Sequence, residues 1–271
     1  VKELAQRIAA TDATVLLESE SGTGKELYAQ AIHNAGARSA GVFVAINCAN
    51  FNANMLESEL FGYAEGAFTG AKRGGKMGLF EAAAGGTLFL DEINSMDIGL
   101  QAKLLKALEE KKARRLGGSR DTPFDVRIVA AVNEPPEELL RSGKLREDLY
   151  YRLGVVRLNL PPLRERPEDI PLLTNYFIEQ YNRSMKRNIR GVTPEVAERF
   201  RRYRWPGNIR QLRNAVEGAF AIARGELLTA EDLEEKLGGG TEQQTRPAAP
   251  APPPEEGISL SQAVERYEKG L

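Results

Sequence analysis

The chain has 271 residues, 42% hydrophobic and 28% charged, which is enough to bury the core of one large domain or two modest ones. Its 37 Lys and Arg residues nearly balance its 38 Asp and Glu residues, so the overall charge gives no reason to expect binding to nucleic acid or to a membrane. The single cysteine, Cys48, excludes a disulfide framework and a multi-cysteine metal site, and it fits a reducing, cytoplasmic location.

The first part of the chain alternates between short β-branched runs and helical patterns. The runs are almost continuously apolar, as expected for strands of a parallel sheet that is covered on both faces. We predict strands at 14–19, 42–47, 86–92, 126–133 and 155–160. Helical patterns lie between them, for example at 24–35 and 99–111. This alternation predicts an α/β layered fold.

Prolines in the stretch LPPLRERPEDIP end this alternation, and residues 168–237 are typical of helices only. Thr193 followed by Pro194 is typical of a helix start. Thr229 with Asp232 resembles a capping box. We therefore expect a separate, small helical domain.

The sequence divides into four expected parts. An α/β core and the helical domain are followed by a Gly/Pro-rich linker, which cannot bury a core, and by an amphipathic stretch that we interpret as the first helix of a further domain. These parts span residues 1–163, 164–238, 239–257 and 258–271. Because the sequence opens within a helical pattern, we also expect a preceding region in the whole protein.

A candidate phosphate-binding loop, SESGTGKE, lies between the first predicted strand and the following helix. In such a loop, backbone N–H groups and the start of a helix converge on an anion. The octet departs twice from the pattern G-x-x-x-x-G-K-[ST], because Ser19 replaces the first glycine and Glu26 replaces the hydroxyl residue. Taken alone, it is also compatible with a simple glycine turn. The candidate nucleotide-binding residues here are Ser19, Glu20, Ser21, Gly22, Thr23, Gly24, Lys25 and Glu26.

Polar side chains end two later strands. Asp91 and Glu92 follow one apolar strand, and Asn133 follows the next. Beside a phosphate loop, Asp91 can hold magnesium, Glu92 can orient or deprotonate water, and Asn133 can hold that water or sense the γ-phosphate. Each feature alone is equally compatible with an ordinary strand end. Together with the loop, they form the arrangement that a P-loop ATPase requires.

Two arginines, Arg146 and Arg152, occur in the segment GKLREDLYYRLGVV. An arginine pair of this kind usually lies on a solvated helix face. In an ATPase assembled as a ring, the same residues would reach the nucleotide of the neighbouring subunit as arginine fingers.

These segments resemble the central AAA+ domain of bacterial enhancer-binding proteins, which activate sigma-54 RNA polymerase. The most specific feature is the hexapeptide GAFTGA within ESELFGYAEGAFTGAKRGG. RLGG, LREDLYYRL, LPPLRER and YRWPGNIRQLRN match the family too, so the resemblance covers roughly residues 1–237. The resemblance implies an AAA+ P-loop ATPase core with a parallel sheet flanked by helices, followed by a small all-α lid domain.

The family's usual phosphate loop resembles GESGTGKE, which makes Glu26 normal and leaves Ser19 as a real departure. A first-position glycine eases the tight turn after the strand, whereas serine adds a Cβ. If the turn requires a positive φ, we expect strain on the order of 1 kcal/mol at Ser19.

The resemblance implies a role for each matched residue. Lys25 binds the β- and γ-phosphates, Asp91 holds magnesium and Glu92 activates water. Asn47 corresponds to the switch asparagine, which holds Glu92 away until nucleotide and partner engage. Asn133 matches the sensor asparagine.

Three arginines complete the implied site. Arg146 and Arg152 match the trans arginine fingers, and Arg210, in GNIRQL, matches the sensor arginine of the lid domain. Val132 stands where the family usually has threonine before the sensor asparagine, and we expect this change to weaken the signal that the sensor passes on from the nucleotide.

The GAFTGA hexapeptide is implied to bind the partner rather than to catalyse. An exposed aromatic residue between small residues is a poor core element and is typical of a mobile loop tip. The family uses this loop to grip sigma-54, driven by the nucleotide state. The residues concerned are Gly66, Ala67, Phe68, Thr69, Gly70 and Ala71.

The implied function is therefore a ring ATPase, hexameric or heptameric, that uses ATP and Mg²⁺ to remodel the sigma-54 holoenzyme and open promoters. DNA would be bound only through a C-terminal domain that begins at 258–271, and no membrane is involved. Because of Ser19, a nucleotide-binding assembly module with impaired hydrolysis is the alternative, and another AAA+ machine, such as an unfoldase or clamp loader, is a third. We interpret His33, Cys48 and Trp205 as packing residues.

Overall fold

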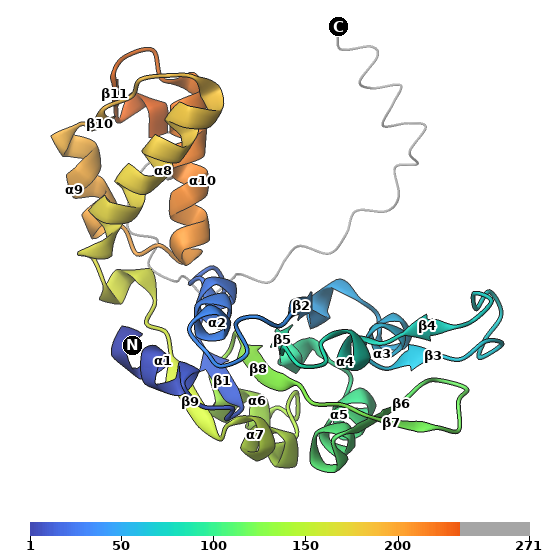
Figure 1. Ribbon diagram of the computed structural model, residues 1–271. Coiled ribbons are helices and arrows are strands. Elements are labelled where there is room, and N and C mark those ends of the chain that lie inside the picture. Colours follow the sequence, from blue (N-terminus) through green and yellow to red (C-terminus); the bar gives the residue numbers. More distant parts are fainter. Residues whose placement is uncertain (234–271) are drawn as a thin grey trace, which may run out of the picture. The chain divides into compact units, whose positions relative to one another are not determined.

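A five-stranded parallel sheet forms the centre of the α/β part of the protein (Figure 1). The computed structural model describes residues 1–233. The strands are β1 (Val15–Glu18), β2 (Phe43–Asn47), β5 (Thr87–Asp91), β8 (Arg127–Val132) and β9 (Val156–Asn159). Their order is β2-β5-β8-β1-β9 and every pairing is parallel, so all five carboxyl ends lie at one edge of the sheet. The five strands predicted from the sequence are confirmed.

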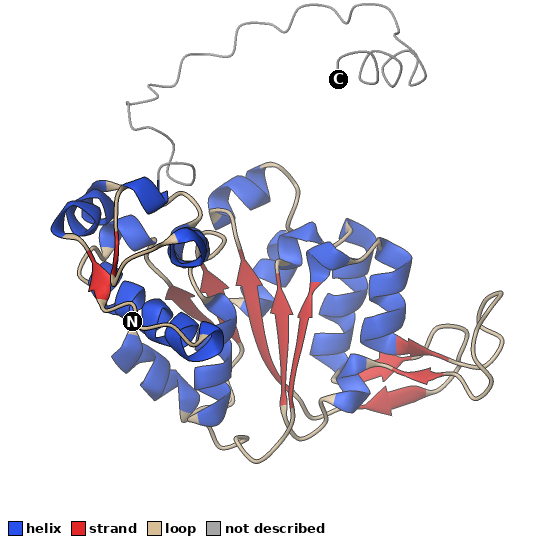
Figure 2. Ribbon diagram, turned by 90° about the horizontal axis from the view of Figure 1, so that it is seen from above, coloured by secondary structure: helices blue, strands red, loops and turns tan. Residues whose placement is uncertain are grey.

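The sheet is apolar on both faces because successive side chains of a strand point to opposite sides. Leu16 of β1 belongs to one buried cluster together with Leu88 of β5. Their chain neighbours, Leu17 and Phe89, belong to the cluster on the other face. Helices cover both faces (Figure 2). They are α1 (Lys2–Ala9), α2 (Lys25–Asn34), α3 (Ala53–Phe61), α4 (Leu79–Ala82), α5 (Ile98–Glu110), α6 (Pro136–Arg141) and α7 (Glu147–Leu153), with short 3-10 turns η1 (Cys48–Asn50), η2 (Ile93–Ser95) and η3 (Leu163–Glu165).

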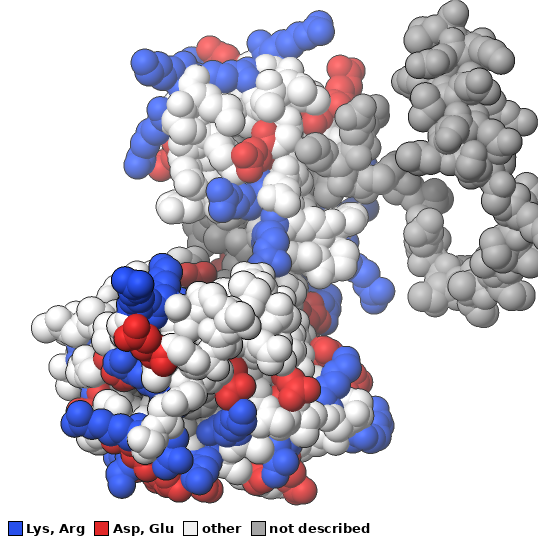
Figure 3. All heavy atoms as spheres, turned by 90° about the vertical axis from the view of Figure 1, so that its right-hand side faces the viewer, with Lys and Arg blue, Asp and Glu red and all other residues white. Residues whose placement is uncertain are grey.

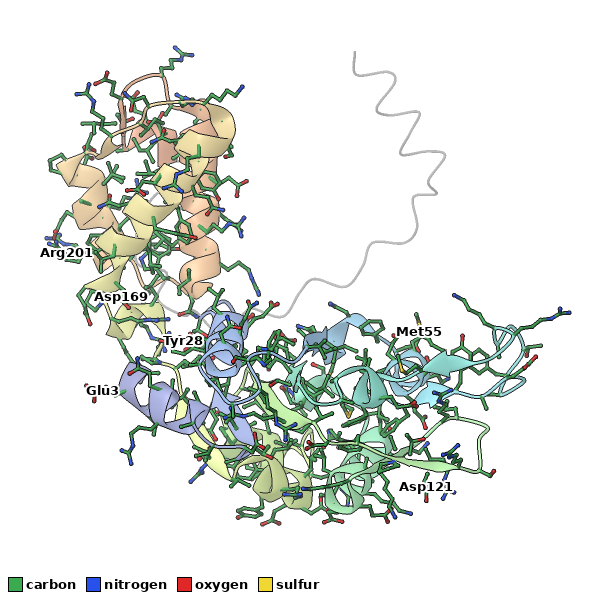
Figure 4. The ribbon with its side chains drawn as sticks, in the orientation of Figure 1. Glu3, Tyr28, Met55, Asp121, Asp169 and Arg201 are labelled. Carbon is green, nitrogen blue, oxygen red and sulfur yellow. The ribbon has the colours of Figure 1, made fainter. Side chains whose placement is uncertain are left out.

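Two hairpins extend from the same side of the core and lie next to one another (Figures 1 and 2). One is formed by β3 (Gly62–Tyr63) and β4 (Lys76–Met77), the other by β6 (Lys112–Arg114) and β7 (Asp121–Pro123). Tyr63 of β3 forms a β-bridge with Leu116 in the loop between β6 and β7, which joins the two hairpins. Asp121 lies on the second hairpin (Figure 4), where its carboxylate accepts a hydrogen bond from Nε of Arg114 at 2.6 Å.

The lid is built from α8 (Asp169–Met185), α9 (Pro194–Arg202), α10 (Asn208–Ile222) and the 3-10 turn η4 (Glu231–Leu233). Trp205 is fully buried, and its indole N–H donates to the carbonyl of Phe200 at 2.8 Å. The predicted start of a helix at Thr193 is confirmed, because its hydroxyl accepts from the N–H of Val196. In the predicted capping box, the carboxylate of Asp232 accepts from the N–H and the hydroxyl of Thr229.

Two details differ from the sequence-based expectations. The lid is helical but also contains a pair of two-residue parallel strands, β10 (Gly191–Val192) and β11 (Leu227–Leu228), which are too short to show an alternating pattern. Cys48 was expected on a buried strand but begins η1 directly after β2, because the polar residue Asn47 ends the strand. Cys48 is nevertheless fully buried, and His33 is buried with its Nδ1 2.9 Å from the hydroxyl of Thr87, so both are packing residues as expected.

The expected linker at 239–257 and the expected helix at 258–271 lie outside the described residues. The boundary placed between residues 163 and 164 stays a prediction. Within residues 1–233, none of the helices combines the length and apolar character that crossing a membrane requires. On the face drawn in Figure 3, basic and acidic side chains are interspersed, as the near-zero net charge of −1 leads one to expect.

Candidate active site

The phosphate loop, residues 19–26, joins β1 to α2. Gly22 and Gly24 have φ angles of 80° and 99°, which side chains of L-residues rarely adopt. A Cβ on Gly22 would lie 2.5 Å from the carbonyl oxygen of Gly207 in the lid, so only glycine fits there. Helix α2 begins at Lys25 with no side-chain cap from Gly24. Its first N–H groups are therefore left for an anion.

Ser19 lies in this loop without a positive φ, so its backbone carries no strain of the kind that a left-handed turn would impose. Its hydroxyl lies 2.7 Å from that of Thr23, which itself donates to the carbonyl of Glu20 at 2.9 Å. Either hydroxyl can be the donor in this pair, and the side chain of Ser19 adds a hydrogen bond to the loop. Among residues 1–233, the non-glycine residues with positive φ are Glu92, Lys111, Lys186, Trp205 and Asn208. Ser19 is not one of them, so the condition under which strain was expected is not met.

Lys25 is 6% exposed, and its Nζ donates to the loop carbonyls of Ser19 and Glu20 at 3.3 and 3.2 Å. Burial lowers the pKa of the Lys25 ammonium, and the carboxylates of Asp91 and Glu92 oppose this shift. Burial likewise raises the pKa of Asp91, opposed mainly by the charge of Lys25. The ammonium of Lys25 and the two carboxylates therefore lie close enough for each sign of charge to stabilise the other.

Asn47 and Asp91 end neighbouring strands and are paired in register. Nδ2 of Asn47 donates to Oδ2 of Asp91 at 3.3 Å, and its Oδ1 accepts from the N–H of Ala49 at 2.9 Å. We expected Asn47 to hold Glu92; in this structure its amide instead holds Asp91, because the strand register brings these two residues opposite one another. Glu92 adopts a left-handed conformation with φ 53°, and its N–H donates to Oδ1 of Asp91 at 3.0 Å.

Asn133 follows β8 at the same edge of the sheet. Its Oδ1 accepts from Nδ2 of Asn94 at 2.9 Å. Asn94 lies on η2, directly after the Asp91–Glu92 pair, and is 9% exposed. Asn94, which was not predicted as a site residue, thus connects the sensor position to the turn that follows the acidic pair.

The two arginines have different surroundings. Arg146 forms a two-pronged ion pair with Asp148, with contacts of 3.0 and 2.7 Å, at the surface. Arg152 lies on α7, and its Nη2 donates to the carbonyl of Leu108 on α5 at 2.9 Å. The buried side chain of Gln101 fixes the start of this segment, because its Oε1 accepts from the N–H of Arg146 at 2.9 Å.

Lid residues contact the phosphate loop directly. Nη1 of Arg210 lies 3.0 Å from the Ser21 hydroxyl. Asn208 is fully buried with φ 51°, and its Nδ2 donates to the Glu20 carboxylate and to the Ser21 carbonyl, both at 3.0 Å. Arg164 forms a two-pronged ion pair with Glu20 at 2.6 and 2.9 Å. This pair and the amide of Asn208 hold the pKa of Glu20 below its usual value.

The GAFTGA residues lie between β3 and β4, away from the residues at the edge of the sheet. Phe68 is 46% exposed, and its ring contacts Tyr63 with a centroid distance of 5.0 Å. The N–H of Ala64 donates to the carbonyl of Leu116 at 2.9 Å. A Cβ on Gly117, which has φ 68°, would lie 2.8 Å from Ala67, so the two loops touch through backbone and small side chains.

Comparison with known proteins identifies the family. The model of the sigma-54 interaction domain matches residues 1–159, and that of the AAA+ ATPase lid domain matches residues 164–250. The chain belongs to the sigma-54 interaction domain family. It is 46% identical over 270 residues to the transcriptional activator RocR of Bacillus subtilis (strain 168), covering 99% of this chain and 58% of RocR. It is 46% identical over 231 residues to the regulatory protein AtoC of Escherichia coli (strain K12), covering 85% of this chain and 50% of AtoC.

Solved structures agree with this assignment. NtrX from Brucella abortus in complex with ADP has a TM-score of 0.81 and 35% identity, covering 99% of this chain and 59% of NtrX. NtrX in complex with ATP has a TM-score of 0.80 and 33% identity. The chain thus spans a little over half the length of RocR and of NtrX. The core is an AAA+ P-loop fold followed by a helical lid, as expected.

Four polar residues at the candidate site were not predicted from the sequence. Asn208 was within reach, because it lies in the same GNIRQL segment as Arg210. Arg164 lies in LPPLRER, which the resemblance also covered. Asn94 and Gln101 gave no signal, because a buried amide cannot be told from an exposed one in a sequence.

The residues present suit a nucleotide with magnesium. The uncapped start of α2 and the buried ammonium of Lys25 suit a polyphosphate, and the partly buried carboxylate of Asp91 suits a divalent cation. Within residues 1–233, no three His, Cys, Asp or Glu residues gather to hold a metal by themselves. Magnesium usually retains water and binds through one or two carboxylates plus substrate phosphates, so a site with a single carboxylate such as that of Asp91 suits it.

Proposed function

We propose that this chain is the ATP-hydrolysing module of a ring-forming activator that remodels the sigma-54 RNA polymerase holoenzyme and thereby opens promoters. The observation that carries the proposal is the meeting of three groups at one edge of the sheet. These are the buried ammonium of Lys25, the carboxylates of Asp91 and Glu92, and the amide of Asn133. The solved complexes of NtrX with ADP and with ATP support nucleotide binding by a chain of this kind.

In this proposal, each residue has a stated task. Lys25 exchanges the loop carbonyls for the β- and γ-phosphates, which are better acceptors for a buried ammonium. Glu92 accepts a proton from the attacking water, and Asn133 donates a hydrogen bond to that water or to the γ-phosphate. Asp91 would hold magnesium, which would supply positive charge to balance the negative charge of the phosphates. Arg210 adds charge from the lid.

Arg146 and Arg152 act in the neighbouring subunit's site. Neither arginine side chain is held in its own subunit by a strong interaction. The pair of Arg146 with Asp148 is at the surface, where such pairs contribute about 0–1 kcal/mol. Arg152 has one hydrogen bond to a neutral carbonyl. Both can be released toward a neighbouring phosphate at small cost, and an arginine finger accelerates hydrolysis by about 10³- to 10⁵-fold.

The first experiment measures ATP hydrolysis against protein concentration. Specific activity should rise with concentration, because the site is complete only in an assembly. Lys25→Ala and Arg152→Ala should each be inactive alone. Mixed one to one, they should recover roughly a quarter of the activity, since an intact loop then meets an intact arginine at random pairings.

The outcomes separate the alternatives. Activity that does not depend on concentration, or no recovery on mixing, would contradict the shared site. ATP binding without turnover in the unaltered chain would support the alternative, an assembly module with impaired hydrolysis, and turnover restored by Ser19→Gly would identify Ser19 as the cause.

A second experiment tests the sigma-54 interaction. Phe68→Ala should abolish binding to sigma-54 in the presence of a transition-state mimic of ATP and leave ATP turnover intact. Met77→Ala is the matched control, because Met77 is 54% exposed on the neighbouring strand β4 but lies outside GAFTGA. Equal loss of binding in both variants would count against GAFTGA as the contact. Retained binding in Phe68→Ala would place the contact outside Phe68, whereas failure of the unaltered chain to bind sigma-54 would favour a different AAA+ machine.

A further inference from the structure

The sensor amide of Asn133 is held by a chain of polar side chains that the proposed mechanism does not yet use. Nδ2 of Asn94 lies 2.9 Å from Oδ1 of Asn133 and 3.4 Å from Oε1 of Glu134. Nζ of Lys144 lies 3.1 and 2.9 Å from the two oxygens of Glu134. The groups thus run in the order Lys144, Glu134, Asn94, Asn133.

The charges in this chain decide which way each amide faces. Glu134 forms an ion pair with Lys144, and the carboxylate of such a pair only accepts hydrogen bonds. The atom of Asn94 nearest to it must then be the NH₂ group. That group also faces Asn133, so Asn133 must present its oxygen to Asn94. Its own NH₂ group is left as a donor to another partner.

One polar atom of the Asn94 side chain has no hydrogen-bond partner. It is buried, and its Oδ1 is buried without a hydrogen-bond partner among the described residues. A buried polar atom without a partner costs free energy, so packing alone does not favour asparagine here. Asn94 also follows the acidic pair by only two residues, on the turn η2, so it links the ends of β5 and β8.

We propose that Asn94 is a positioning residue that fixes the amide of Asn133 with its NH₂ group directed to the γ-phosphate or the attacking water. Glu134 and Lys144 set the direction of Asn94 itself. An NH₂ donor discriminates ATP from ADP, because only ATP has the γ-phosphate that it would contact. The inference rests on the ATP site proposed above and adds a residue that orients its sensor.

The test is calorimetric measurement of the dissociation constants for ADP and for the non-hydrolysable β,γ-imido analogue of ATP. Asn94→Leu, which removes the donor at similar size, should weaken binding of the analogue roughly 10-fold relative to ADP. Asn94→Asp should weaken it at least as much, because an acceptor at this position would turn the NH₂ group of Asn133 away from the phosphate. A purely structural asparagine would give the opposite order, since Asp is the closer isostere. Ser95→Ala, an exposed change on the same turn, should leave both constants unchanged.

A double-mutant cycle with Asn133→Ala completes the experiment. If Asn94 acts through Asn133, then Asn94→Leu should have no further effect on the ratio of the two constants in the Asn133→Ala background. Additive effects, or equal weakening for both nucleotides, would overturn the inference while leaving the proposed function standing. Failure of the unaltered chain to bind either nucleotide would overturn the proposed function, and this inference with it.

Discussion

The hydroxyl groups of Ser19 and Thr23 lie 2.7 Å apart across the phosphate loop. The Thr23 hydroxyl also donates a hydrogen bond to the carbonyl of Glu20. A serine at the first position of the loop is thus accommodated by a side-chain hydrogen bond. A glycine could not form it.

Ser19→Gly should therefore change little in catalysis and reduce stability. We expect kcat/KM for ATP to change less than about threefold, because the backbone at Ser19 is unstrained. The free energy of unfolding should fall by about 1 kcal/mol, through the lost hydrogen bond and the greater freedom of glycine when unfolded. Urea denaturation followed by circular dichroism measures the second effect. A more than tenfold gain in turnover would instead show that Ser19 blocks the site.

Gly22 and Gly24 offer a matched pair of substitutions. Both have positive φ, so alanine at either position should cost on the order of 1–2 kcal/mol in backbone strain. Only at Gly22 would the new Cβ also meet the lid, 2.5 Å from the Gly207 carbonyl, whereas at Gly24 the nearest atom is 3.9 Å away. Gly22→Ala should thus lower the urea midpoint clearly more than Gly24→Ala. Equal midpoints would mean that the lid moves away from the loop at no cost.

Gln101 should be the most sensitive buried amide in the core. Its Nε2 donates to the carbonyls of Met96 and Lys144, at 2.9 and 2.8 Å, and its Oε1 accepts from the N–H of Arg146. Gln101→Leu leaves these backbone groups unpaired, which should cost about 2–4 kcal/mol of stability. Leu105→Ala, a partly buried apolar change on the same helix, serves as a control for packing. ATP turnover should fall further than the loss of stability explains, because the segment that begins at Arg146 loses its hydrogen bond to Gln101.

Cys48 should be unreactive in the folded protein. Burial raises the pKa of its thiol to about 12, compared with about 8.5 for a free thiol. A thiol-specific reagent at pH 8 should modify it only after unfolding, because the thiolate is the nucleophile. The sign for stability follows from linkage. The folded state favours the neutral thiol, so the contribution of Cys48 to the free energy of unfolding is fully present below pH about 8.5 and is lost as pH rises toward 12. Cys48→Ala should remove this fall in stability with pH. Rapid labelling of the native protein would mean that the edge of the sheet opens.

Much of the fold followed from pattern. Apolar runs such as TVLLES and GTLFLDE have the length and composition of buried parallel strands, and the polar residue that ends each run marks the carboxyl edge. That is why Asp91 and Asn133 were found at the right edge. Strand order brings Asn47 beside Asp91, and order cannot be obtained from local pattern.

The roles of the buried amides could not be predicted from the sequence. Asn94, Gln101 and Asn208 are ordinary polar residues in a sequence. Their importance arises because the fold buries each beside backbone or side-chain groups from distant segments, such as Asn133 or Arg146. The absence of strain at Ser19 had the same origin, since φ at one residue depends on how the whole loop closes.

The buried position of Trp205 has a practical consequence. It is the chain's single tryptophan, and its carbonyl accepts from the N–H of Asn208, whose side chain reaches the phosphate loop. Intrinsic fluorescence excited at the indole therefore comes from one site alone, three residues from that contact. Ligand-induced movement of the lid against the loop should alter its emission without any attached dye. The protein thus carries its own optical reporter of lid position.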